Sequence, residues 1–234
     1  MLRTATQSMD RTPPSVARPL AHRLLELGAL TVFLSYTAGF LGRITLAVDT
    51  MAGGFALSAG LIFGYLLADL ISGVAHWLGD RFGRESTPFL GPNFIAPFRE
   101  HHEDPQAMVQ HGFVELVGNT AVFASPVIVT AYYLLDIQAQ SSWTLFHAGT
   151  VTSVMIGVVA TNVIHRWAHM EEPSYLARLL QKTGLILNRE RHARHHAGSF
   201  DRAYCITSGW MDGALDALRV WSRAERMLGR RPSD

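Results

Sequence analysis

Residues 54–76 read GFALSAGLIFGYLLADLISGVAH, a continuous apolar run that contains a single charged residue, Asp69. A helix needs about 20 such residues to cross the roughly 30 Å hydrocarbon core of a bilayer. Three further apolar runs cover residues 24–47, 120–135 and 143–164, and the third of the four, 120–135, is short. The sequence therefore predicts an all-α membrane protein with about four transmembrane helices.

The positive charges predict how these helices are oriented. Of the 20 Lys and Arg residues, 19 fall in residues 1–23, 77–119 and 165–234, and only Arg43 lies elsewhere. Cytoplasmic segments are enriched in Lys and Arg. We therefore expect a multi-pass protein of a bacterial inner membrane with both termini in the cytoplasm. A soluble protein with very apolar core helices is disfavoured, because such long runs are rare in soluble folds.

The remaining composition excludes several classes of partner and site. The net charge of +1 predicts no nucleic-acid partner. The single cysteine, Cys205, excludes an internal disulfide framework and a cysteine-based zinc module. We expect residues 1–23 to form a disordered polar tail, residues 24–215 the folded domain, and residues 216–234 a polar C-terminal tail.

Histidine is the unusual residue in this composition, and its positions are informative. Ten of the 11 histidines fall on the predicted cytoplasmic side or at its membrane boundary, with His147 as the exception. Neutral imidazole is a common metal ligand near neutral pH. We take nine as candidate metal ligands, and interpret His22 and His147 as structural. The nine are His76, His101, His102, His111, His165, His169, His192, His195 and His196.

The spacing of these histidines supports a shared site. His165 and His169 are one helical turn apart, so both rings project from one face. His192, His195 and His196 have offsets of three and four, which also places them on one face if the segment is helical. Nine ligands exceed the needs of one tetrahedral zinc. We therefore predict two metal ions in a cytoplasmic histidine-rich cap; imidazole ligands suit iron, zinc or copper.

Each histidine group also has a simpler interpretation. The segment His192–His196 lies among arginines and could be a basic surface that meets lipid headgroups. His165 and His169 could be polar residues at the membrane interface. These simpler interpretations would have to hold for several groups at once, which makes the metal site the favoured prediction.

Several other polar residues are candidates for a supporting role. A carboxylate inside an apolar helix is costly and usually functional, so we expect Asp69 to support a ligand or to bond to another helix. Arg99 is a candidate for binding the phosphate of a lipid headgroup, or for pairing with Glu100. Carboxylates and amides orient ligand rings through their second nitrogen. Candidates for this role are Asp69, Asp80, Glu100, Asp104, Glu115 and Asn162.

At these residues the sequence resembles a known family. Residues 69–80 (DLISGVAHWLGD), 97–105 (PFREHHEDP) and 111–115 (HGFVE) are similar to the Kua/CarF-type lipid desaturases, the plasmanylethanolamine desaturase family. Residues 161–169, 192–196 and 204–210 continue the resemblance in the same order. Two departures are Arg191, where animal members have a histidine, and Gly112, where aspartate is common.

The resemblance implies a reaction and a cofactor. Such enzymes convert the 1-O-alkyl chain of an ether phospholipid into the 1-O-alk-1′-enyl chain of a plasmalogen. They use dioxygen and two electrons from an external donor, which here would be cytochrome b5-like or ferredoxin-like. The resemblance therefore implies a di-iron centre held by the nine histidines, with O2 as co-substrate and residues 24–215 as a lipid desaturase domain.

Three alternatives stay open from the sequence. A fatty-acyl desaturase or hydroxylase would use the same centre, and plant phosphatidylglycerol desaturases share similar histidine motifs. A zinc-dependent membrane hydrolase would work without oxygen. A metal transporter would place its histidines along a path within the helices, whereas only His147 lies away from their inner ends.

Overall fold

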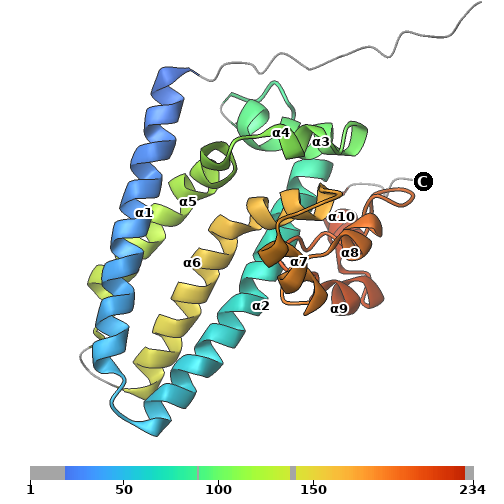
Figure 1. Ribbon diagram of the computed structural model, residues 1–234. Helices are drawn as coiled ribbons and strands as arrows, with labels where there is room; N and C mark the ends of the chain where they lie inside the picture. The colour runs from blue at the N-terminus through green and yellow to red at the C-terminus, as the bar shows by residue number, and fades with distance from the viewer. Residues whose placement is uncertain (1–18, 89, 138–140, 230–234) are drawn as a thin grey trace, which may run out of the picture.

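The computed structural model describes residues 19–88, 90–137 and 141–229 and is helical throughout, without strands in those ranges (Figure 1). Residues 1–18 of the predicted N-terminal tail and residues 230–234 of the predicted C-terminal tail lie outside the described residues. The four long helices are α1 (Leu20–Ala47), α2 (Met51–Arg81), α5 (Phe113–Leu134) and α6 (Ser142–His169). The short helices are α3 (Ala96–Glu103), α4 (Ala107–Gln110), α7 (Tyr175–Lys182), α8 (Arg189–Ala193), α9 (Asp212–Ala217) and α10 (Val220–Met227), and a π-helical segment, Gly91–Ile95, precedes α3.

The four long helices are long and apolar enough to cross a membrane, which confirms the predicted number of spans. Several of their ends extend beyond the predicted spans: α1 begins at Leu20, α6 continues to His169, and two further differences affect the site. α5 begins at Phe113 rather than near residue 120, because Glu115 and Asn119 are part of its first turns despite their polarity. α2 continues to Arg81, so Asp80 is placed one helical turn beyond His76 on the same helix.

The long helices pack as two pairs, α1 with α5 and α2 with α6 (Figure 1). Glycines allow the second pair to approach closely. A Cβ atom on Gly60 or Gly64 of α2 would overlap the backbone carbonyl of Phe146 or Thr150 of α6. Small residues of this kind permit close helix packing in membranes, where hydrophobic burial provides little driving force.

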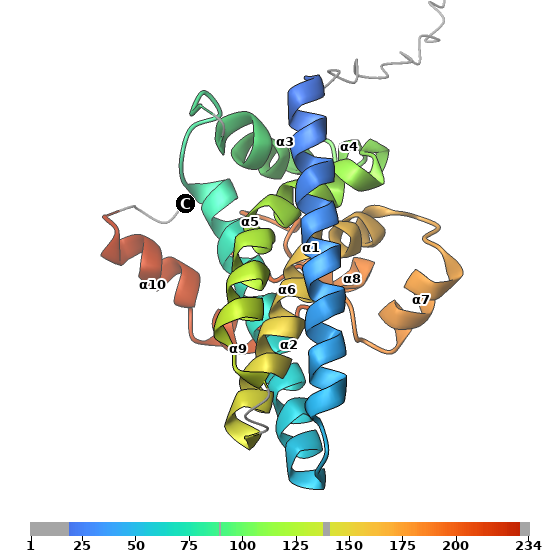
Figure 2. The same ribbon diagram turned by 90° about the vertical axis from the view of Figure 1, so that its left-hand side faces the viewer.

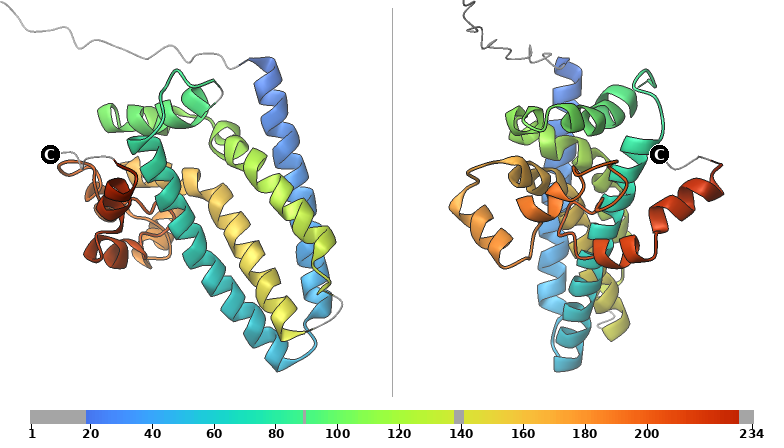
Figure 3. Two further views of the ribbon diagram at one scale, coloured as in Figure 1. Left: turned by 180° about the vertical axis from the view of Figure 1, so that it is seen from behind. Right: turned by 90° about the vertical axis from the view of Figure 1, so that its right-hand side faces the viewer.

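Several segments that carry or adjoin the candidate histidines lie at one end of the helix pairs. The beginning of α1, the segment with α3 and α4, and the end of α6 are all at this end, while the turn from α1 to α2 is at the other (Figure 3). Arg43 is near that other end, where its guanidinium donates to the carbonyls of Tyr132 and Leu135 at the C-terminus of α5. The partial negative charge of a helix C-terminus stabilises a cation there.

The chain after α6 folds against the side of α2. The Asp69 carboxylate accepts hydrogen bonds from the backbone N–H groups of Ser208, Gly209 and Met211, at 2.6, 3.0 and 3.0 Å. The Ser72 hydroxyl accepts one from Ile206 N–H at 3.0 Å. Asp69 therefore holds a backbone turn, whereas we expected a contact with a ligand or with another helix.

Helices α7 and α10 lie on opposite flanks of the long helices (Figure 2). Part of the predicted polar tail 216–234 is folded, since Trp221 of α10 is 5% exposed and packs against Trp77 with ring centroids 5.7 Å apart. The Glu225 carboxylate accepts hydrogen bonds from Arg81 Nε at 2.7 Å and Trp77 Nε1 at 3.3 Å. Packing therefore continues past residue 215, because aromatic and paired charged residues of α10 cover the end of α2.

Candidate metal centre

Seven of the nine candidate histidines form two adjacent groups, and one of them, His101, belongs to both groups. The first group is His76, His101, His102 and His195, and the second is His101, His165, His169 and His192. In each group the four ligand atoms lie within 4.8 Å of one another. His196 lies against the second group, with its Nε2 3.0 Å from His192 Nε2. Eight of the nine predicted ligands are therefore together at one end of the long helices.

The first group contains a carboxylate in addition to imidazoles. Asp80 Oδ2 is 3.4 Å from His76 Nε2, 3.4 Å from His102 Nε2 and 3.3 Å from His195 Nε2. His102 Nε2 and His195 Nε2 are 3.0 Å apart. The side chains of these four residues come from α2, α3 and the turn after α8, so the group exists only in the folded chain.

Backbone carbonyls fix the orientation of two of these rings. Nδ1–H of His76 is 3.1 Å from the carbonyl oxygen of Tyr204, and Nδ1–H of His195 is 2.8 Å from that of Arg202. A neutral imidazole that donates from Nδ1 carries its lone pair on Nε2. Metal-binding histidines commonly have this second hydrogen bond, which fixes the tautomer.

The second group is formed by nitrogens at similar separations. His165 Nε2 is 2.8 Å from His192 Nε2 and 3.2 Å from His169 Nε2, and the last two atoms are 2.9 Å apart. One ring proton cannot serve three mutually close nitrogens. Nitrogens bound about 2.1 Å from one ion would be roughly 3.0–3.4 Å from each other. The observed separations are therefore close to those of atoms that share a cation.

The predicted box His192–His196 divides between the two groups. Helix α8 ends at Ala193, and residues 194–196 form a turn. As a result, the His195 ring faces Asp80, while His192 and His196 face the second group. The prediction of a common helical face holds for His165 and His169 on α6 but not for this short segment.

The surroundings favour the neutral form of four of these rings, His101, His102, His192 and His196. Burial, followed by the repulsion of neighbouring histidines, lowers the pKa of His102 to about 3, and the same causes lower that of His196 to about 3. The same causes hold the pKa values of His101 and His192 well below 6.5. Neutral rings have lone pairs available for a metal. Nε2 of His76 and of His101 are buried and have no hydrogen-bond partner among the described residues, so the side chains fit metal ions.

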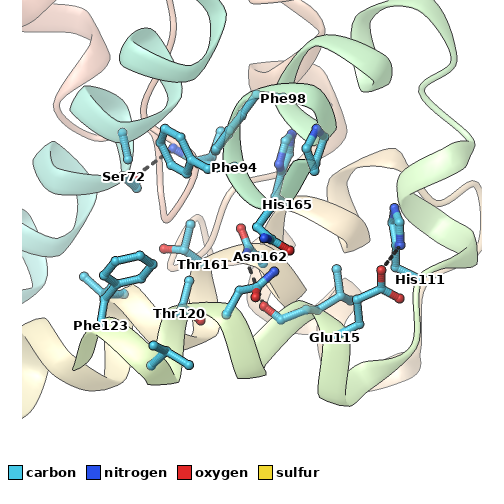
Figure 4. A pocket seen from close by; sticks show the side chains of 18 of the residues that line it. Ser72, Phe94, Phe98, His111, Glu115, Thr120, Phe123, Thr161, Asn162 and His165 are labelled. Carbon is cyan, nitrogen blue, oxygen red and sulfur yellow. Dashed lines mark hydrogen bonds and ion pairs between the residues drawn. The ribbon is translucent and has the colours of Figure 1, made fainter. Parts of the chain in front are cut away.

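His111, the ninth candidate, lies apart from both groups. Its Nδ1 is 2.8 Å from the Glu115 carboxylate, and its side chain is 31% exposed. Both residues line a cavity of about 400 Å³, which lies between the helix pairs and extends to His101 and His165 (Figure 4). The predicted support residue Asn162 also lines this cavity and donates from Nδ2 to the carbonyl of Leu116 at 3.0 Å.

The other predicted support residues have local contacts. Arg99 donates to the carbonyls of Phe82 and Gly83 at 3.2 Å and is not among the residues that line the cavity. Asp104 Oδ1 accepts from Gln106 N–H at 3.0 Å. Glu100 is exposed. Among the described residues, none of these three side chains hydrogen-bonds to or pairs with a clustered histidine.

The cavity wall also includes a residue that we interpreted from the sequence as only structural. His22 of α1 lines the cavity, and its Nε2 is 3.2 Å from Asn119 Oδ1 and 3.2 Å from Glu26. Glu26 is 1% exposed. A histidine and a glutamate four residues apart at the start of an apolar helix was the sequence signal for this pair.

Comparison with known proteins identifies the family. Residues 65–232 match the model of the lipid desaturase domain, which covers most of the chain. The chain belongs to the lipid desaturase family. This lipid desaturase is therefore an oxidoreductase that acts on a lipid, and its matched region contains all eight clustered histidines. Membership argues against the hydrolase and transporter alternatives.

Three relatives of this lipid desaturase have stated activities. It is 37% identical over 208 residues to plasmanylethanolamine desaturase of Myxococcus xanthus, covering 89% of this chain and 72% of that protein. It is 33% identical over 177 residues to plasmanylethanolamine desaturase 1 of Mus musculus, covering 72% of this chain and 64% of that protein. It is 32% identical over 220 residues to the chloroplastic fatty acid desaturase 4 of Arabidopsis thaliana, covering 90% of this chain and 64% of that protein. No solved structure matches the chain.

Proposed function

We propose that this lipid desaturase introduces the vinyl-ether double bond into 1-O-alkyl ether phospholipid, converting plasmanylethanolamine into plasmenylethanolamine. The observation that carries the proposal is the cavity between the helix pairs, which extends to His101 and His165 of the metal centre. Its wall includes apolar residues such as Ile71, Phe123 and Val158. Such a wall suits a lipid chain whose reacting carbons reach the histidines.

The reaction must balance in atoms and electrons. The alkyl ether loses one hydrogen from C1 and one from C2, and the C1–C2 single bond becomes a double bond. One O2, two external electrons and two protons complete the balance, and two waters are formed. Two irons bound at the clustered histidines would supply the oxidising power that side chains lack. The electron donor would be cytochrome b5-like or ferredoxin-like and would approach from the end that bears the histidines.

The polar part of the cavity wall suits a lipid headgroup. Glu115 pairs with His111 in this wall (Figure 4), and Asn119, one turn further along α5, contacts His22. The Glu115 carboxylate, which pairs with His111 and is 28% exposed, carries the negative charge that would attract the ammonium group of ethanolamine. In this arrangement the headgroup stays at the membrane boundary and the first carbons of the chain point toward His165.

The distribution of basic residues supports a location for the centre. The N-terminal end of α1, α3, α4 and the end of α6 are at one end of the helices, and the chain after α6 packs against the side of α2; these segments have most of the basic residues. Because cytoplasmic segments are enriched in Lys and Arg, this distribution supports a cytoplasmic position for that end. The centre would therefore meet a substrate at the cytoplasmic face of a bacterial inner membrane.

A second candidate function is desaturation of a fatty-acyl lipid. The 32% identity to the Arabidopsis fatty acid desaturase 4 favours it, because that relative covers 90% of this chain. The cavity would hold an acyl chain in the same way, and the difference would be whether an ether or an ester oxygen lies beside the reacting carbons.

Expression in a plasmalogen-deficient host supplied with alkyl ether lipid tests the proposal. The measurement is vinyl-ether phospholipid by mass spectrometry before and after mild acid, because vinyl ethers are acid-labile. We expect product with the native chain in air, and none without oxygen or with His196→Ala. An acid-stable double bond in an acyl chain would instead support the second candidate and contradict the first.

A further inference from the structure

A carboxylate is directed at the imidazoles of the first group. Asp80 Oδ2 is within 3.3–3.4 Å of three Nε2 atoms, those of His76, His102 and His195. The Asp80 side chain is 4% exposed, and neither of its oxygens has a hydrogen-bond partner among the described residues. A buried carboxylate without a partner is costly, so these contacts need an explanation.

Hydrogen bonds from the rings do not provide it. The Nδ1 protons of His76 and His195 are directed to the carbonyls of Tyr204 and Arg202. Their Nε2 atoms therefore carry lone pairs and cannot donate to the carboxylate while the rings are neutral. His102 can supply at most one proton, and its Nε2 also faces His195 Nε2 at 3.0 Å. Electron-rich atoms so close together repel one another unless a cation lies between them.

We infer that Asp80 is a direct metal ligand, which makes the two metal positions chemically unequal. This inference rests on the proposed two-metal centre and adds a ligand to it. The first position has one carboxylate oxygen with imidazoles, while the second group is composed of histidines alone. The negative charge of Asp80 strengthens the binding of a divalent ion at the first position and favours a harder ion there.

Because the two positions differ in their ligands, one substitution should remove the ion from the first position and leave the ion at the second. Asp80→Asn keeps the size of the side chain but removes its charge and one ligand oxygen. Purified protein is reconstituted with Fe(II) without oxygen and passed over a desalting column, and bound metal is measured by mass spectrometry. We expect two ions per chain in the native protein and about one in Asp80→Asn, because the first position loses a ligand oxygen together with its negative charge. Glu100→Gln, an exposed carboxylate on α3, should keep two.

The outcomes separate this inference from the proposed function. A native protein without bound transition metal contradicts the proposed centre itself. A native protein with two ions and an Asp80→Asn variant with two ions of unchanged affinity contradicts the role of Asp80 alone. The Asp80→Glu variant, which retains a carboxylate, should recover the second ion.

A measurement on the native protein covers the case in which Asp80→Asn does not fold. Chains labelled with 13C-carboxyl aspartate are compared by infrared spectroscopy with and without Fe(II). Coordination shifts the carboxylate stretching bands of one buried aspartate. An identical spectrum in the two states would overturn the inference.

Discussion

His165 Nε2 and His192 Nε2 lie 2.8 Å apart, although the two residues are separated by 27 positions and belong to different helices, α6 and α8. Both rings are buried, and His169 approaches the same point from α6. The second histidine group therefore joins the end of the long helix α6 to the short helix α8 that follows it.

Substitution of His192 should remove the ion of the second group. We expect His192→Ala to bind about one ion fewer than the native chain and to lose activity by at least about 100-fold, because ligand loss leaves an incomplete site. Metal analysis and vinyl-ether formation check this. His147→Ala is the matched control, since His147 is half-buried, lies outside both histidine groups, and its Nδ1 bonds to the carbonyl of Trp143 on its own helix. Equal metal content in both variants would contradict the prediction.

His111 provides the opposite test. Because its Nδ1 is 2.8 Å from Glu115 and it lies outside both histidine groups, His111→Ala should keep two ions per chain. We expect KM for the lipid to rise by about tenfold, because the polar part of the cavity wall loses one side of its ion pair. Metal analysis alongside lipid titration distinguishes this outcome from loss of a ligand. A fall to one ion would place His111 in the metal shell after all.

Filling the cavity should block the substrate without affecting the metals. Ala75 of α2 lines the cavity, while its neighbour Val74 is 38% exposed on the outside of the helix. Ala75→Phe should lower activity by at least about tenfold with metal content unchanged, because a larger side chain occupies the space of the lipid chain. Val74→Phe should retain activity. Similar activity in the two variants would show that the chain binds elsewhere.

Acid should destabilise the metal-free protein. His102 and His196 have pKa values lowered to about 3 in the folded chain, against 6.5 in the unfolded chain. Between about pH 6.5 and 3 the unfolded state binds more protons, so the free energy of unfolding falls as the pH is lowered, by about 1.4 kcal/mol per pH unit for each histidine. Denaturant unfolding in detergent at several pH values measures the slope. In the double variant His102→Gln/His196→Gln, the free energy of unfolding should depend less steeply on pH. An unchanged dependence would show that these two histidines are not its source.

The contact between α10 and α2 should contribute to stability. Glu225 is 3% exposed and accepts hydrogen bonds from Arg81 and Trp77. Glu225→Ala leaves the Arg81 guanidinium without its carboxylate, and we expect the free energy of unfolding to fall by about 3 kcal/mol. Arg226→Ala, an exposed substitution on the same helix, should change it by less than about 0.5 kcal/mol. Comparable losses in the two variants would show that the pair is not the source of the effect.

Long-range packing limited what could be predicted about the site. Asp69 was recognisable as a functional carboxylate because it interrupts an apolar run, but its partners, Ser208, Gly209 and Met211, are about 140 positions away. The extension of α5 to Phe113 was missed because Glu115 and Asn119 made that stretch look like a loop. Both side chains line an internal cavity, which hydropathy along the chain cannot reveal.

The sequence by itself determined the four apolar helices and the grouping of histidines in the segments around one end of them, because span length and helical periodicity depend on residues close together in the chain. Only the tertiary structure decided how the histidines are divided, with His195 facing Asp80 and His192 facing His165, and with His111 outside both groups. That division depends on where α8 ends and how the chain after α6 docks on α2, and both result from contacts between residues far apart in the chain.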